Sequence, residues 1–472
     1  MGCLIELLEN AYFHCLHYVV NKRLRKVERL FWALWAILAI VGAIFLVTIS
    51  VDTFYSTKAS IRVRTDYLDF TAPFPAIFFC EEKEIKGKFE EMLKHLKFNL
   101  TDRQSALDIE NFVRAASFIR PLDRAMPQRI CDNPQKDYCR FITAYGQDLS
   151  LFANHIRAGC KEIFTSCTFN GVEFDCCERF LPVGTYEGKC FVVNSYNAFI
   201  ENNLLNGSVE AQYGSLRRGQ KIGALRHDAA LNPANLSVEL AHTDLSVWYM
   251  GNTNIPTKMY QKHNHLHERR FREFRTADIH LRVLVASPDN SLLKLEVKRR
   301  NCKLSQEAQS LRSFKVYSNS ACEVECIKQA QLELCGCYIH LLPSENDLLN
   351  KQCNISGLNC VSQALEIRKY LAKCICISNC LLIDVSLIGI VPNFEYDNDI
   401  RLRNNKSKKR VNFITRAPTV QYVRHANQEF LDFIVSIGGA ISLFIGCSCL
   451  TVAQIVYYFL VKPLVERHHP KH

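Results

Sequence analysis

The sequence lacks the motifs that most directly indicate an enzyme. It contains no HExxH zinc signature, no glycine-rich phosphate-binding loop and no recognisable pairing of a nucleophile with a base. These absences argue against metalloprotease, nucleotide-hydrolysing and triad-hydrolase chemistry. We therefore predict that the protein is not an enzyme and that it uses no cofactor and no bound metal.

The sequence also lacks any concentrated block of basic residues. The net charge of +11 is spread along the chain, and no cluster of Lys and Arg is interleaved with aromatic residues. Nucleic-acid-binding proteins usually carry such a patch, so we expect no nucleic acid partner. There is no internal repeat and no low-complexity linker. The 48% hydrophobic content is ordinary, so any membrane segment must be found locally.

Only two long runs carry no charge, Leu30 to Val51 and Phe433 to Val461. Each is long enough to cross a bilayer as a helix, which takes about 20 residues. No small-residue cleavage site follows the first run, so it is predicted to be an uncleaved span rather than a signal peptide. Basic residues precede the first run and follow the second, which places both termini in the cytosol.

These boundaries divide the chain into five parts. They are a cytosolic N-terminus (1–29), a first transmembrane helix (30–51), an extracellular domain (52–429), a second transmembrane segment (430–461) and a cytosolic C-terminus (462–472). The prediction is a multi-pass protein of the plasma membrane in contact with lipid.

Cysteine is abundant where the chain is predicted to be extracellular. Of 22 cysteines, eighteen lie between positions 80 and 380. Few histidines are interleaved with them, so an oxidised framework of disulfides is favoured over the alternative of zinc sites. Spacing alone leaves the pairing open. The predicted disulfide-forming residues are Cys80, Cys131, Cys139, Cys160, Cys167, Cys176, Cys177, Cys190, Cys302, Cys322, Cys326, Cys335, Cys337, Cys353, Cys360, Cys374, Cys376 and Cys380.

Five glycosylation sequons fall in the same region and agree with an extracellular location. They are at Asn99, Asn206, Asn235, Asn354 and Asn405. Alternating apolar residues predict strands at Ile279–Ala286 and Leu292–Val297. Helices are predicted at Glu81–Leu100 and Cys322–Leu334, the second with two cysteines on one face. The expected class is α+β, with a disulfide ladder that joins two helices into a rigid strut.

The second apolar run is rich in small residues, with Gly438, Ser442 and Gly446 on one helix face. Two interpretations remain open. The face could let neighbouring helices pack closely, or the helix could break at Gly446-Cys447-Ser448 beside a water-filled path. Asp432, at the outer end, could concentrate cations at a pore mouth or could simply end the apolar run.

Several stretches together resemble the degenerin/epithelial sodium channel family, most closely its arthropod pickpocket branch. The match runs almost end to end. The stretches are Glu28–Trp32, Phe74–Cys80, Thr185 with Gly188, Cys190, Phe191 and Asn194, Tyr317–Ser318 with the following cysteines and Pro343, Ser436–Gly439, and Leu443–Ser448.

The resemblance implies a trimeric, amiloride-sensitive, sodium-selective cation channel made of related subunits. It also implies an ectodomain of palm, ball, finger, thumb and knuckle parts between two transmembrane helices. In that scheme Gly446, Cys447 and Ser448 form the selectivity filter. Further pore-lining and gate residues are Asp432, Val435, Gly438, Gly439 and Ser442.

The chain departs from the family pattern at several positions. The cytosolic gating pair His-Gly is represented by His14-Cys15, which removes the backbone freedom of glycine. Val435 stands where the family prefers a small residue, Ser442 replaces a glycine, and Gln454 replaces an acid. The alternative function is therefore a non-conducting two-span receptor or accessory subunit that binds ligands or partners through its ectodomain.

Overall fold

The computed structural model describes most of the chain and divides it into two compact units. The described residues are 18–19, 21, 23–56, 59–65, 71–118, 134–202, 225–228, 233–257, 265–266, 276–343, 351–362, 369–370, 372–393, 409–416, 420–426, 430–446, 448, 451, 453 and 456–461. We call residues 1–60, 289–300 and 425–472 the helical unit, and residues 61–288 and 301–424 the sheet unit.

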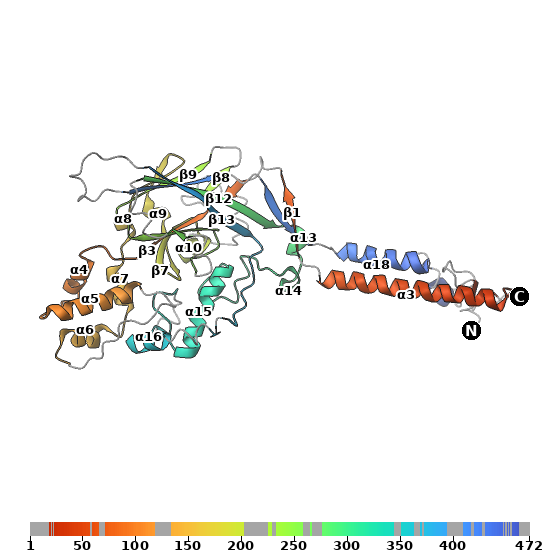
Figure 1. Cartoon of the computed structure of the whole chain (residues 1–472), viewed down its shortest axis with the longest axis horizontal. Helices are drawn as coiled ribbons and strands as arrows, with labels where there is room; N and C mark the ends of the chain where they lie inside the picture. Colours follow the sequence, from red (N-terminus) through yellow and green to blue (C-terminus); the bar gives the residue numbers. More distant parts are fainter. Residues whose placement is uncertain are drawn as a thin grey trace. The chain divides into compact units, whose positions relative to one another are not determined.

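The helical unit contains two apolar helices, α3 (Lys26–Ser56) and α18 (Phe430–Ile445) (Figure 1). Among the described residues, α3 is the one helix both long and apolar enough to cross a membrane. The unit also contains two short helices, α13 (Asn290–Leu293) and α14 (Val297–Arg300), and a π-helical turn at Tyr457–Val461.

The strand predicted at Leu292–Val297 is wrong, because this region contains the end of α13, a non-helical turn and the first residue of α14. The Asp289 side chain caps α13 by accepting hydrogen bonds from the backbone N–H groups of Ser291 and Leu292. Burial alone would raise the pKa of Asp289, but these hydrogen bonds outweigh it and hold the pKa below its usual value. A local side-chain cap thus overrides the alternation of apolar residues.

The sheet unit is built on two main β-sheets. The larger has the order β1-β15-β12-β14-β9-β4-β5, with β13 paired to the other edge of β12. Its strands are β1 (Ser60–Arg64), β4 (Phe164–Phe169), β5 (Val172–Phe174), β9 (Ala234–Leu240), β12 (Thr276–Pro288), β13 (Leu382–Asn393), β14 (Lys409–Arg416) and β15 (Gln421–His425). The strand predicted at Ile279–Ala286 lies within β12, as expected.

The second sheet has the order β11-β10-β3-β7-β6. Its strands are β3 (Ala76–Glu81), β6 (Leu181–Thr185), β7 (Gly188–Val193), β10 (Leu245–Met250) and β11 (His265–Leu266), and β2 (Thr71–Pro73) pairs separately with β8 (Arg226–Asp228). Every residue of β3 is buried. Phe78 belongs to one apolar core and Phe79 to the other, because successive side chains point to opposite faces.

Helices cover the core that contains Phe78. They are α4 (Lys88–His95), α5 (Arg103–Phe118), α6 (Asp137–Tyr145), α7 (Ser150–Ile156), α10 (Tyr196–Glu201), α15 (Asn319–Cys335) and α16 (Ile355–Ser362). Two short helices, α8 (Cys160–Ile163) and α9 (Cys176–Arg179), pack against the core that contains Phe79. The helix predicted at Cys322–Leu334 lies within α15. The prediction for Glu81–Leu100 was too long, since Glu81 ends β3 and α4 begins only after Gly87, whose φ of 92° interrupts regular helix.

Sixteen of the predicted cysteines form eight disulfides. The pairs are Cys80–Cys190, Cys160–Cys177, Cys167–Cys176, Cys302–Cys380, Cys322–Cys376, Cys326–Cys374, Cys335–Cys360 and Cys337–Cys353. Cys139 is buried and carries a free thiol, so its assignment to a disulfide was wrong. Its position in α6 faces the apolar core, where a small thiol packs like a hydrophobic residue. Cys131 lies outside the described residues.

The last four of these pairs form an antiparallel ladder along and beyond α15. One rung, Cys335–Cys360, joins α15 to α16 as the predicted strut requires. Two others join α15 to the non-helical stretch that contains Cys374 and Cys376. The strut is therefore a helix joined by two disulfides to a non-helical segment.

Candidate functional site

The two apolar helices of the helical unit lie side by side (Figure 1). Their contact is made by small and aromatic residues. The Ser50 and Ser436 hydroxyl oxygens are 3.1 Å apart. At Gly42, a Cβ atom would lie only 2.7 Å from Cε1 of Phe444, so a glycine is needed for this close approach. Ala440 is buried at the same face of α18.

The small-residue face predicted for α18 points away from α3. Asp432, Val435, Gly438, Gly439 and Ser442 are all exposed, and Val435 is 65% exposed. A Cβ at Gly438 or Gly439 would meet no atom within 4 Å in the described part of the chain. Within the chain, the small residues therefore do not pack α18 onto α3. They form a continuous face with space in front of it.

Helix α18 ends at the position where a break was one of the two interpretations left open by the sequence. Helix α18 stops at Ile445, and Gly446 has a φ of 75°, in the left-handed region that favours glycine. The Gly446 N–H still donates to the Ser442 carbonyl over 2.9 Å, which closes the last turn. Further along the run, Thr451, Ala453 and Val456 are again α-helical.

Ser448 lies just beyond the break and is linked to Thr451. The Ser448 N–H donates to Thr451 Oγ1 over 3.1 Å, and the two hydroxyl oxygens are 3.3 Å apart. Thr451 was missed by the sequence analysis, although a hydroxyl three residues after Ser448 is a typical partner in a short turn. Cys447 lies outside the described residues, as do His14, Cys15 and Gln454.

Arg299 of α14 holds the end of the helix pair at which α3 ends and α18 begins, and it is another residue that the sequence analysis missed. Its Nη2 donates to the Phe54 carbonyl over 3.0 Å, and its guanidinium carbon lies 3.9 Å from the centroid of the Phe54 ring. The same ring stacks on Phe433 of α18 at 4.2 Å. One arginine thus contacts the last turn of α3, where the helix dipole favours a cation, and acts on α18 through a shared aromatic ring.

Replacing Arg299 by alanine should loosen this junction. The variant loses a cation–π contact and a charge-assisted hydrogen bond, together worth about 1–3 kcal/mol. We expect a lower thermal midpoint for the purified full-length protein. The matched control is Lys298→Ala, an exposed neighbour on the same short helix. Equal midpoints for the two variants would contradict the role given to Arg299.

The predicted glycosylation sites differ in accessibility. Asn99 is exposed, whereas the side-chain amide of Asn354 donates to Gln147 and its carbonyl oxygen accepts from Gly357. Asn235 is half-buried. Asn206 and Asn405 lie outside the described residues. Modification at all five positions stays a prediction, and Asn99 offers the least obstructed side chain of the three that are described.

Comparison with known proteins adds independent information. A family model described as "Amiloride-sensitive sodium channel" matches residues 7–458. Sodium channel protein Nach of Drosophila ananassae is 22% identical over 458 residues, which cover 95% of this chain and 84% of the relative. Nach of Drosophila melanogaster is 23% identical over 498 residues, covering 95% and 85%. Pickpocket protein 28 of the same fly is 21% identical over 517 residues, covering 97% and 78%.

Among solved structures, a proton-activated chloride channel aligns with 92% of this chain and 96% of its own. The sequence identity is 8% and the TM-score 0.26, and this likeness carries no argument.

Proposed function

Because the chain belongs to the amiloride-sensitive sodium channel family, we propose that it is a subunit of a trimeric, amiloride-sensitive channel that conducts sodium passively. Its relatives are the Nach and pickpocket proteins of flies, and the family is one of ion channels rather than enzymes. The proposal places the subunit in the plasma membrane with both termini in the cytosol and the sheet unit outside.

One observation carries the proposal. The face of α18 that bears Asp432, Val435 and Ser442 is exposed in the single chain, and the helix breaks at Gly446 directly after it. A membrane helix held on one side by α3 leaves this opposite face for other copies of the helix or for a water-filled path. Three such faces around an axis would line a pore.

The chemistry of this face suits a cation pathway. Three copies of Asp432 would raise the local concentration of cations at the outer mouth. Deeper in the membrane, backbone carbonyls freed by the break and the hydroxyl of Ser448 would replace part of the hydration shell of a sodium ion. In the proposal, Gly446, Cys447 and Ser448 form this narrow part, and Val435 lies at the gate.

Changes in the ectodomain would reach the pore through the segment Asp289–Arg300. This segment belongs to the helical unit although it directly follows β12 in sequence. Arg299 fixes it to Phe54, and Phe54 stacks on Phe433 of the pore helix. A displacement of α14 therefore acts on the outer ends of both helices at once.

The proposal is tested by recording current from cells that express the chain alone and together with related subunits. We expect an inward current that amiloride blocks and that disappears when external sodium is replaced by a large organic cation. The control is surface labelling of the same cells. Full surface delivery without current in any combination would reject the channel proposal and favour a non-conducting receptor or accessory subunit.

A further inference from the structure

The sheet unit contains a cavity of about 740 Å³. The end of β3, helices α4 and α7, strands β6 and β7 and residues 340–343 line it, and it is partly open to solvent. Its volume falls within the range of about 300–1,000 Å³ that is typical of small-molecule sites. The cavity lies entirely within residues of the sheet unit and plays no part in the proposed conduction path.

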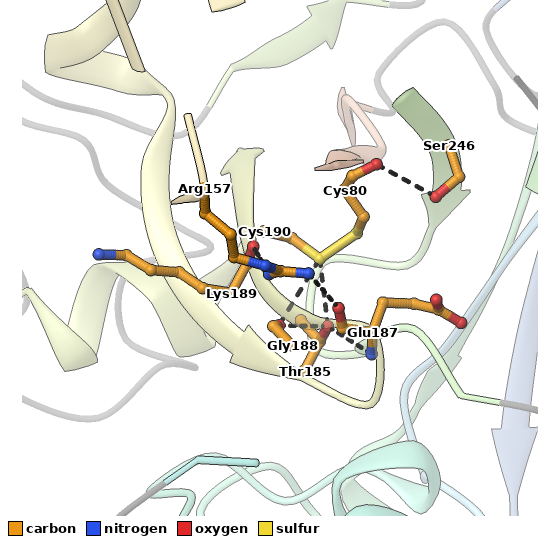
Figure 2. The surroundings of a disulfide bond; sticks show 8 residues. All are labelled: Cys80, Arg157, Thr185, Glu187, Gly188, Lys189, Cys190 and Ser246. Carbon is orange, nitrogen blue, oxygen red and sulfur yellow. Dashed lines mark hydrogen bonds between the residues drawn. A yellow bond between two sulfur atoms is a disulfide. The ribbon is translucent and has the colours of Figure 1, made fainter. Parts of the chain in front are cut away.

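The basic side chains beside the cavity already have partners. Lys88 Nζ lies 2.6 Å from a carboxylate oxygen of Glu162. Each nitrogen of Arg157 donates to a backbone carbonyl, those of Ser117, Glu187 and Lys189. Figure 2 shows Arg157 beside Glu187 and Lys189. Lys189 itself is exposed. Burial raises the pKa of the nearby Glu201 carboxyl, and the Gly184 N–H and the charge of Lys189 only partly oppose that effect. These interactions leave little capacity to bind an anion.

Two buried hydrogen-bond acceptors in the lining have no hydrogen-bond partner in the described part of the chain. One is Oε1 of Glu81, a residue whose side chain is 4% exposed and whose other oxygen accepts from the Ala158 N–H over 2.8 Å. The other is Nδ1 of His340, which is 8% exposed. Nε2 of His340 is 3.0 Å from the Ala116 carbonyl, so Nε2 carries the proton and Nδ1 accepts.

The two acceptors without donors, Glu81 Oε1 and His340 Nδ1, indicate which kind of ligand would fit the cavity. Buried acceptors without donors are costly, at about 1–3 kcal/mol each. Apolar wall is supplied by Met92, Leu341 and Leu342, which are almost fully buried. We propose that this cavity binds a small organic ammonium compound, an alkyl or arylalkyl amine whose N–H groups donate to Glu81 and His340 while its carbon chain packs on this wall.

The site should respond to pH through Glu81. Burial raises the pKa of this carboxyl to about 7, with Glu162 and Glu84 acting in the same direction and the Ala158 N–H and Arg157 opposing. His242 Nε2, 3.7 Å from Glu81 Oε1, has a pKa lowered by burial. Burial also lowers the pKa of His340, to about 4. Amine binding needs the Glu81 carboxylate, so affinity should increase as pH rises through about 7.

The test is isothermal titration calorimetry on purified full-length protein with n-pentylammonium as the probe. Two comparison compounds separate the contributions. Pentyltrimethylammonium keeps the charge without N–H donors, and 1-pentanol keeps the chain without the charge. We expect pentylammonium to bind at least about tenfold more tightly than either, and about tenfold more tightly at pH 8 than at pH 6. Because binding is measured directly, the result does not depend on whether the chain conducts.

The decisive variant is Glu81→Gln, which keeps the shape of the side chain and an acceptor for the Ala158 N–H. It should weaken pentylammonium binding at least about tenfold and abolish the pH dependence. The matched control is Glu91→Gln, in the same cavity wall but with a side chain that is 75% exposed. This control should bind as the wild type does.

Three results would overturn the inference. They are no heat of binding at millimolar pentylammonium, equal loss in both variants, or equal binding of pentanol. If Glu81→Gln fails to fold, the affinity of the wild type for pentylammonium at different pH values provides the test. An affinity that does not change between pH 6 and pH 8 would reject the site.

Discussion

Gly446→Val should abolish the sodium current proposed for this protein, while the variant still reaches the cell surface. Gly446 has a φ of 75°, and a residue with a Cβ in this region costs about 1–2 kcal/mol. A side chain also removes the helix penalty of glycine, about 1 kcal/mol, and so favours continuation of α18 through the break. In the proposed trimer, the cost of a Cβ at this positive φ would apply to each of the three subunits at the proposed narrowest part of the pore.

The measurement is whole-cell current normalised to surface-labelled protein. Gly389→Val is the matched control, because Gly389 lies in strand β13, where valine is favoured and a Cβ meets nothing within 4 Å. This control should retain normal current. Unaltered current and sodium-to-potassium ratio in Gly446→Val would show that the break at this glycine does not form the filter.

Removal of the disulfide between Cys80 and Cys190 should have a comparably large effect on folding. This bond joins β3 to β7, the two strands paired at Phe79 and Phe191. Both sulfur-bearing residues are at most 1% exposed, and the bond closes a separation of 110 residues. A crosslink over about 100 residues contributes up to roughly 4.7 kcal/mol in the chain-entropy model. We expect the double alanine variant to be retained in the cell rather than delivered.

The comparison is the double alanine variant of Cys160 and Cys177, whose separation is 17 residues. Cys167–Cys176, which lies within that loop, stays intact and already restricts it. Loss of the outer bond should therefore reduce surface delivery much less. Surface biotinylation and the thermal midpoint of purified protein would measure both effects. Equal delivery of the two variants would contradict this ranking of the disulfides.

The sequence predicted the parts of the fold whose signal is local. Ile279–Ala286 alternates because one face of β12 is buried more deeply than the other, and Cys322–Leu334 forms a helix between the Ser318 cap and Gly336. Leu292–Val297 failed because Asp289 caps a helix there. The predicted helix Glu81–Leu100 began too early because Glu81 belongs to β3. This strand is buried on both faces, so its sequence lacks the alternation of apolar and polar residues that would have indicated a strand.

The candidate pore residues also include some that local sequence could predict and some that only the tertiary structure reveals. The positive φ of Gly446 agrees with a break at this residue, and the exposure of Val435 agrees with the predicted face. The first depends on glycine itself and the second on the helix period, and both can be read from local sequence. Arg299 and its contact with Phe54 could not have been predicted. The two residues are 245 positions apart, and no periodicity links them.

By itself, the sequence determined the two apolar runs, the set of cysteines available for oxidation and the family to which the chain belongs. These follow from composition and short-range order. The tertiary structure alone decided which cysteines pair, which face of α18 remains uncovered, and which buried acceptors in the cavity lack donors. Each of these depends on segments far apart in the chain that meet only after folding, where packing and hydrogen-bond satisfaction are settled between distant side chains.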